Sequence, residues 1–172
     1  ADTLVFALET PAPIQESFRD LLLLNPETIG YLTVGKDIAL PVVQREYDND
    51  FYLNHNFEGE ESDGGTLFLD GANLLTPEDL NLIVYGHNMK NGTMFHPLLQ
   101  YENREYLVRN PVISFDTIYK NRRYLPFAVF TASMEENSKG YVDIRQFAFD
   151  QDSFERFADR MKKLSVLDIP VD

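Results

Sequence analysis

The sequence predicts a mainly β fold, a closed or half-closed β-barrel with helices attached. Six short segments rich in β-branched and aromatic residues follow one another at irregular spacing, which favours a barrel over a regular βαβ repeat. Two further segments have helical periodicity. No repeat, low-complexity linker or change of composition divides the 172 residues. We therefore expect one domain over residues 1–172.

The first element is expected to be a helix over about residues 14–25, packed outside the main body. Asn25-Pro26 ends its periodic pattern. The apolar side chains that form its stripe are Ile14, Phe18, Leu21, Leu22 and Leu24. The barrel part of the domain then extends over about residues 29–172.

Short strands are expected next, joined by turns and loops. Gly35 begins a three-residue turn between the first two strands. Pro41 has no N–H to donate to a neighbouring strand, so the second strand should lie at a sheet edge or carry a bulge there. The six strands are predicted at residues 29–34, 38–43, 66–69, 80–85, 111–115 and 124–131.

Two helical segments follow or interrupt these strands. Residues 94–107, rich in Leu, Tyr and Glu, predict one or two short helices. Residues 152–164 predict a long amphipathic helix, with Asp152 and Glu155 at capping-box spacing. The basic residues of its last turns, which the helix dipole favours, are Arg160, Lys162 and Lys163.

Composition excludes several classes of function. The formal net charge is −13 and no Lys/Arg cluster interrupts it, so nucleic acid is not an expected partner. The sequence has no cysteine, which excludes a disulfide scaffold and a Cys-ligated zinc site. No apolar stretch approaches the roughly 18 residues that span a bilayer, so we expect any membrane anchor to lie upstream of residue 1.

Three histidines are the candidates for acid–base chemistry. His55 lies in a polar loop and His96 precedes Pro97 at a predicted helix start, contexts typical of structural or solvated histidines. His87 differs because an apolar strand ends at Gly86 and a loop follows. A strand end that presents one imidazole to a loop-lined cleft suits proton transfer. Local context leaves a catalytic and a structural role for His87 both open.

Several ordered motifs resemble those of class B sortases. Residues 85–95 read YGHNMKNGTMF, nearly identical to the family's histidine segment. Residues 41–44, 48–57 and 65–70 resemble its preceding segments in the same order. Tyr141 and the predicted helix 152–164 are similar to its long loop and class-specific helix. The resemblance covers roughly residues 14–172.

The resemblance implies a surface cysteine transpeptidase on an eight-stranded β-barrel. In this family a cysteine attacks a C-terminal sorting motif of a secreted protein, and an amine from a cell-wall precursor or a pilin lysine resolves the thioester. A histidine transfers protons, an arginine stabilises the oxyanion, and no cofactor or metal is used. The implied place is the extracellular face of the cell membrane. By motif matching His87 is the catalytic histidine, and the implied substrate-binding residues are Asn49, Leu53, Tyr85, Tyr141 and Val142.

One departure from the family is large. A Thr-Leu-x-Thr-Cys segment should follow the amphipathic helix, but the sequence ends at residue 172 without it. We expect a barrel that lacks its last two strands, is inactive alone, and obtains strands from an additional tail, by strand exchange or in a dimer. The arginines that do not match the family's catalytic arginine are Arg122, Arg123, Arg145 and Arg160.

Other interpretations stay open at this point. Pilin polymerisation differs from wall anchoring only in the amine used. A sortase-like domain that binds a peptide or partner without chemistry is a second alternative. A metal-dependent hydrolase is disfavoured because its ligands would fit no short zinc motif. The acidic run 58–63 lacks EF-hand spacing and predicts a solvated turn. The ligands of such a hydrolase would be His55, Asp70, His87 and His96.

Overall fold

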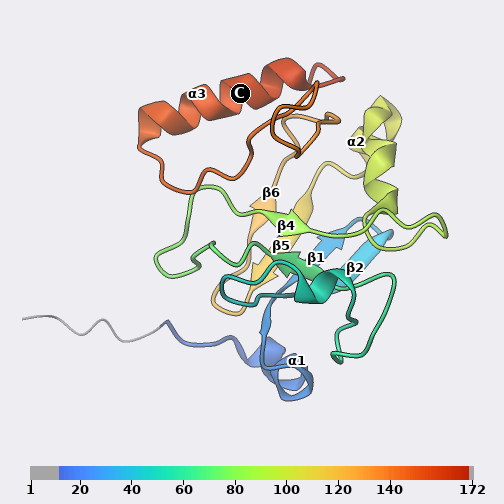
Figure 1. Cartoon of the computed structure of the whole chain (residues 1–172), viewed down its shortest axis with the longest axis vertical. Coiled ribbons are helices and arrows are strands. Elements are labelled where there is room, and N and C mark those ends of the chain that lie inside the picture. Colours follow the sequence, from blue (N-terminus) through green and yellow to red (C-terminus); the bar gives the residue numbers. More distant parts are fainter. Residues whose placement is uncertain (1–11, 171–172) are drawn as a thin grey trace, which may run out of the picture.

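A computed structural model describes residues 12–170, in which a central sheet lies between helices at opposite ends of the molecule (Figure 1). The helix α1 lies at one end, and α3 lies across the other. In chain order the elements are the 3-10 helix η1 (Glu16–Phe18), α1 (Arg19–Leu24), β1 (Thr28–Val34), β2 (Ile38–Val43), η2 (Phe51–Leu53), β3 (Leu67–Leu69), β4 (Val84–Tyr85), η3 (His96–Glu102), α2 (Arg104–Arg109), β5 (Ile113–Thr117), β6 (Arg123–Tyr124) and α3 (Gln151–Leu164).

The six strands form one sheet in the order β4-β3-β2-β1-β5-β6. Neighbours are antiparallel except β2 and β3, which are parallel and pair Val42 with Leu67 and Val43 with Phe68. Within residues 12–170 the outer strands β4 and β6 do not pair with each other, so the sheet is an incomplete barrel. This confirms the predicted mainly β fold with missing closure.

The alternation of side chains along the strands divides the core between two faces. On one face Leu67 and Leu69 join a buried cluster that includes Tyr101 of η3 and Tyr106 of α2. On the other face Phe68 packs with the rest of a smaller cluster around η2. The buried members of this second cluster are Val43, Tyr52 and Phe68.

The β1–β2 hairpin forms as its sequence predicts. Gly35 takes a left-handed conformation in the turn, with φ of 52°. Pro41 pairs with Tyr31 of β1, and β3 pairs with β2 only from Val42 onward. Pro41 therefore lies in a stretch of β2 whose strand partner within the described residues is β1 alone, in keeping with the predicted edge position.

Two predicted strands are much shorter than expected because their backbone groups bond elsewhere. Of residues 80–85 only Val84–Tyr85 are strand. Ile83 N instead donates to the Asn73 side chain at 2.8 Å. Of residues 124–131 only Tyr124 belongs to a strand, Arg123–Tyr124. Farther along, Val129 N donates to the Ser165 hydroxyl at 3.0 Å, which ties this stretch to the segment after α3.

The predicted helices are present with modified ends. The N-terminal helix is η1 followed by α1, and the segment after His87 forms the two short helices η3 and α2. The long helix α3 buries Phe157 and Met161. The predicted capping box of Asp152 and Glu155 is wrong.

The capping box of α3 begins two residues earlier than predicted. The Asp150 side chain accepts from Ser153 N at 2.8 Å, and the Ser153 hydroxyl accepts from Asp150 N at 3.0 Å. Asp150 has the extended backbone of an N-cap residue, and the helix itself starts at the next residue. None of the helices within residues 12–170 combines the length and apolar character needed to cross a membrane.

Candidate functional site

His87 lies just beyond β4, and Gly86 determines which way its side chain faces. A Cβ at Gly86 would collide with Leu67 Cδ2 and lie 2.8 Å from Phe95 Cδ2, so Gly86 faces the larger core cluster. Neighbours along an extended chain point to opposite sides. Tyr85 and His87 are therefore directed toward the other face of the sheet, where Phe68 packs against Tyr85.

The loop that follows His87 closes on itself. Phe95 N donates to His87 O at 2.8 Å, and Asn88 and Met94 form an isolated antiparallel bridge. The Nδ1 of His96 lies 2.7 Å from the Asn88 side-chain oxygen, and since that oxygen can only accept, Nδ1 carries the proton. These bonds fix the backbone from His87 onward, and the pairing of β4 with β3 fixes the residues before it.

The His87 side chain is partly exposed, and its ring nitrogens have no hydrogen-bonding partner within residues 12–170. It is not enclosed in an apolar interior. His87 thus lies just past the end of the outer strand β4, with a fixed backbone and free ring nitrogens. An imidazole in this position can accept a proton from one group and deliver it to another.

The other two histidines have structural contacts. The His55 ring stacks on Phe51 with centroids 3.9 Å apart, and its Nδ1 donates to Phe51 O at 2.8 Å. His96 is the partner of Asn88 described above. Among residues 12–170 no group of three or more His, Asp or Glu side chains is placed to hold a metal ion. The carboxylate of Asp70, one of the four ligands considered, is instead bound to Arg145 and Tyr85.

Three of the predicted substrate-binding residues lie near one another. Leu53 and Tyr85 both pack against the smaller core cluster. Asn49 precedes η2, and its side-chain oxygen accepts from Gly71 N at 2.7 Å. Asn49 and Tyr85 thus both bind the turn after β3. Asn49 accepts from the Gly71 backbone, and Tyr85 donates to the Asp70 side chain. Their contact with a substrate stays a prediction.

Tyr141 and Val142 lie in a separate loop. Val142 N donates to Ser133 O at 3.1 Å, and Ser133 N donates to Gly140 O at 2.9 Å, so the loop closes at its base. The Tyr141 side chain is exposed. The link between this loop and the other three residues is Arg145, three residues after Val142, which reaches Asp70.

Asp70 is a polar centre of the site, whereas the sequence suggested it only as a ligand of the disfavoured metal-dependent hydrolase. Its side chain is fully buried and accepts from Tyr85 Oη at 2.8 Å, Ala72 N at 3.0 Å, and Arg145 at 2.9 Å from Nε. Burial by itself would raise the pKa of Asp70, but these hydrogen bonds outweigh it and lower the pKa below its ordinary value of 3.8. Burial and the bond to Asp70 raise the pKa of Tyr85, so its hydroxyl stays protonated and donates.

The lowered pKa of Asp70 predicts a loss of stability in acid. A carboxyl whose folded pKa is depressed contributes stability that is present above its unfolded pKa, about 3.9, and is lost as pH falls through the folded value. The free energy of unfolding, measured with urea between pH 7 and pH 2.5, should therefore decrease below about pH 4. Glu27 and Glu78, whose pKa values are also lowered, contribute in the same direction.

The Asp70→Asn variant measures how much of this acid-dependent loss of stability comes from the Asp70 carboxyl. It should be less stable than the unsubstituted protein at pH 7 and should lose less additional stability on acidification. Equal losses in both proteins between pH 5 and pH 3 would show that Asp70 does not contribute.

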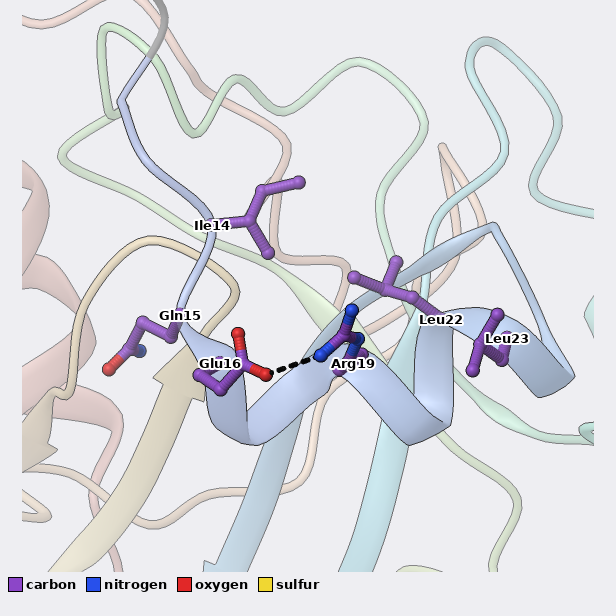
Figure 2. A pocket seen from close by; sticks show the side chains of 6 residues that line it. All are labelled: Ile14, Gln15, Glu16, Arg19, Leu22 and Leu23. Carbon is purple, nitrogen blue, oxygen red and sulfur yellow. Dashed lines mark hydrogen bonds and ion pairs between the residues drawn. The ribbon is translucent and has the colours of Figure 1, made fainter.

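The described surface also has hollows that do not include His87. One, about 310 Å³, lies along η1 and α1, where Arg19 binds Glu16 beside apolar side chains (Figure 2). A second, about 240 Å³, lies between the end of β2 and the turn after β3. Neither is lined by a histidine, so neither is the site of the predicted proton transfer.

Comparison with known proteins finds similar sequences. The chain is 35% identical over 154 residues to the sortase B of Listeria monocytogenes, an alignment that covers 89% of this chain and 60% of that protein. The chain thus spans about 60% of the length of that curated relative. No protein-family model matches the sequence.

Solved structures are similar over nearly all of the chain. Sortase B from Listeria monocytogenes aligns with a TM-score of 0.77 and 32% identity, over 90% of this chain and 86% of that one. A Staphylococcus aureus sortase B–substrate complex aligns with a TM-score of 0.79 and 26% identity, over 93% and 72%. A sortase B complexed with triglycine aligns with a TM-score of 0.82 and 27% identity, over 94% and 73%.

Proposed function

Because the chain has the sortase fold and belongs to the sortase B family, we propose that it is the histidine-bearing part of a transpeptidase. The whole protein would cleave a C-terminal sorting motif of secreted proteins and join them to cell-wall peptidoglycan at the extracellular face of the membrane. The observation that carries this proposal is His87, held beyond β4 with free ring nitrogens on the same side as Tyr85.

The proposed reaction has two acyl-transfer steps. A thiolate attacks the carbonyl carbon of the scissile peptide bond, the C–N bond breaks, and protonated His87 gives its proton to the leaving amine. A thioester remains. Neutral His87 then takes a proton from an incoming amine, which attacks the thioester, forms a new amide and releases the thiolate. The imidazole thus returns to its starting protonation state.

The 172 residues contain no cysteine, so in this reaction the thiol is supplied by residues outside them. We propose the same for the arginine that would stabilise the oxyanion, because Arg122, Arg123, Arg145 and Arg160 do not match the family's catalytic arginine, and Arg145 and Arg122 are bound to the carboxylates of Asp70 and Glu78. We propose Asn49, Leu53, Tyr85, Tyr141 and Val142 as the residues that bind the sorting peptide. The relative solved with a substrate and the one solved with triglycine support a peptide donor and an amine acceptor.

Acyl transfer by the full-length protein tests the proposal. Sorting-motif peptides are incubated with the full-length protein and triglycine, and mass spectrometry detects the glycine-extended product. We expect this product from the full-length protein and no turnover from the 172-residue chain, which has no thiol. A lysine-bearing acceptor peptide in place of triglycine distinguishes pilin polymerisation from wall anchoring.

Two results would contradict the proposal. Turnover by the 172-residue chain would show that cleavage needs no thiol. Peptide binding by the full-length protein without any acyl transfer would instead identify a non-catalytic binding domain.

A further inference from the structure

We propose that Asp70 and Arg145 are positioning residues that hold the loop bearing Tyr141 and Val142 in place relative to Tyr85 of β4, another of the residues proposed to bind the peptide. This inference rests on the proposed function for its effect on substrate. Its structural part, the contribution of the ion pair to the attachment of the loop, does not depend on that function. Neither residue is assigned a chemical step.

The ion pair joins two parts of the chain that are 75 residues apart. Arg145 Nε lies 2.9 Å from Asp70 Oδ2, and its terminal Nη2 lies 3.2 Å from Oδ1, so both carboxylate oxygens are used. The carboxylate is fully buried, whereas the arginine side chain is 48% exposed. The fixed, planar fork of a guanidinium suits such two-point binding, and a lysine ammonium does not reproduce it.

The segment around Arg145 has little other regular structure to hold it. Residues 142–150 form neither helix nor strand. The Asn81 side-chain amide donates to Ile144 O at 2.8 Å and to Gln146 O at 3.0 Å, on either side of Arg145. The loop is therefore fastened to the end of the sheet by side chains from the turn after β3 and from the approach to β4.

One carboxylate thus binds side chains from two of the segments that are proposed to bind the peptide. Asp70 Oδ2 accepts from Tyr85 Oη at 2.8 Å as well as from Arg145. Tyr85 belongs to β4, two residues before His87, while Arg145 follows Tyr141 by four residues. If the ion pair is broken, the loop can move relative to Tyr85, but His87 keeps its own backbone bonds. We therefore expect weaker peptide binding with little change in the chemical step.

Two substitutions of Arg145 in the full-length protein test this prediction. Arg145→Met removes the charge and the fork, and Arg145→Lys keeps the charge alone. Arg145→Met should raise the KM for the sorting peptide about tenfold and change kcat by less than about threefold. Arg145→Lys should give an intermediate KM, a partial rescue that a general loss of folding would not produce.

The matched control is Arg122→Met. Arg122 also binds a partly buried carboxylate, that of Glu78, and Glu78 keeps a second cation, Lys120, whose Nζ lies 2.9 Å from it. This control should leave KM unchanged. A loss confined to kcat in Arg145→Met, or an equal rise of KM in Arg122→Met, would overturn the positioning role.

Hydrogen exchange separates this inference from the proposed function. In Arg145→Met the backbone amides of residues 141–146 should exchange faster, while those of β1 and β2 stay protected. This measurement needs no substrate, so it decides the attachment of the loop even if the protein cleaves no peptide. Unchanged exchange over residues 141–146 would show that the ion pair does not hold the loop.

Discussion

Substitution of His87 by glutamine is expected to lower the kcat for sorting-peptide cleavage by the full-length protein about 10³-fold. Glutamine is similar in length and can still form hydrogen bonds, but it cannot accept or release a proton near neutral pH. The leaving amine would then depart without its proton. The rate of cleavage of a fluorogenic sorting peptide, measured over a range of peptide concentrations, gives kcat for each protein. The melting temperature shows whether the fold is retained.

The fold should tolerate this change well. The His87 ring is partly exposed and has no hydrogen-bonding partner within residues 12–170, so its replacement leaves no buried group unsatisfied. His55→Gln is the control, because His55 stacks on Phe51 and has no place in the proposed reaction. The kcat of the His55→Gln protein should stay within about threefold of that of the unsubstituted protein. A His87→Gln protein that retains a tenth of its kcat would remove His87 from the mechanism.

The parts of the fold that were predicted well are those with strong local patterns. β1 alternates buried and less buried residues, β2 is apolar throughout, and a glycine turn joins them; both strands form close to the expected residues. The two strands that are shorter than predicted bond to side chains outside their own segments. The Asn73 side-chain oxygen accepts a hydrogen bond from Ile83 N, and the Ser165 hydroxyl accepts one from Val129 N. No sequence pattern within residues 80–85 or 124–131 predicts these hydrogen-bonding partners.

The candidate site shows the same division between local and distant contacts. The position of His87 at a strand end was readable from the apolar run before it, and the resemblance to sortases then gave the histidine a role. The Asp70–Arg145 pair was not predicted, since it joins residues 75 positions apart. Its one local signal is Asp70 itself, a charged residue directly after the buried strand β3. A charge in that place needs a partner, but the sequence does not say which of the cations provides it.

Substitution of Leu67 by alanine is expected to reduce the free energy of unfolding by about 3 kcal/mol, within the usual range of about 2–5 kcal/mol for a buried leucine. Leu67 is fully buried in the larger core cluster and belongs to β3, between β2 and β4. Its removal leaves a cavity whose walls are strand backbone and packed side chains, which cannot collapse easily. Urea unfolding of the full-length protein at pH 7 measures the loss. Leu99→Ala on the half-exposed side of η3 is the control and should cost about 0.5 kcal/mol or less.

The cavity left by Leu67→Ala would open directly behind Gly86, and this gives the prediction a second test. Gly86→Ala alone should also destabilise the protein, because the added methyl would collide with Leu67 Cδ2 and crowd Phe95. In the double variant the methyl enters the space that the leucine has left. The two losses should then sum to more than the loss of the double variant, by about 1 kcal/mol. Strict additivity would mean that the added methyl and the Leu67 side chain do not compete for the same space.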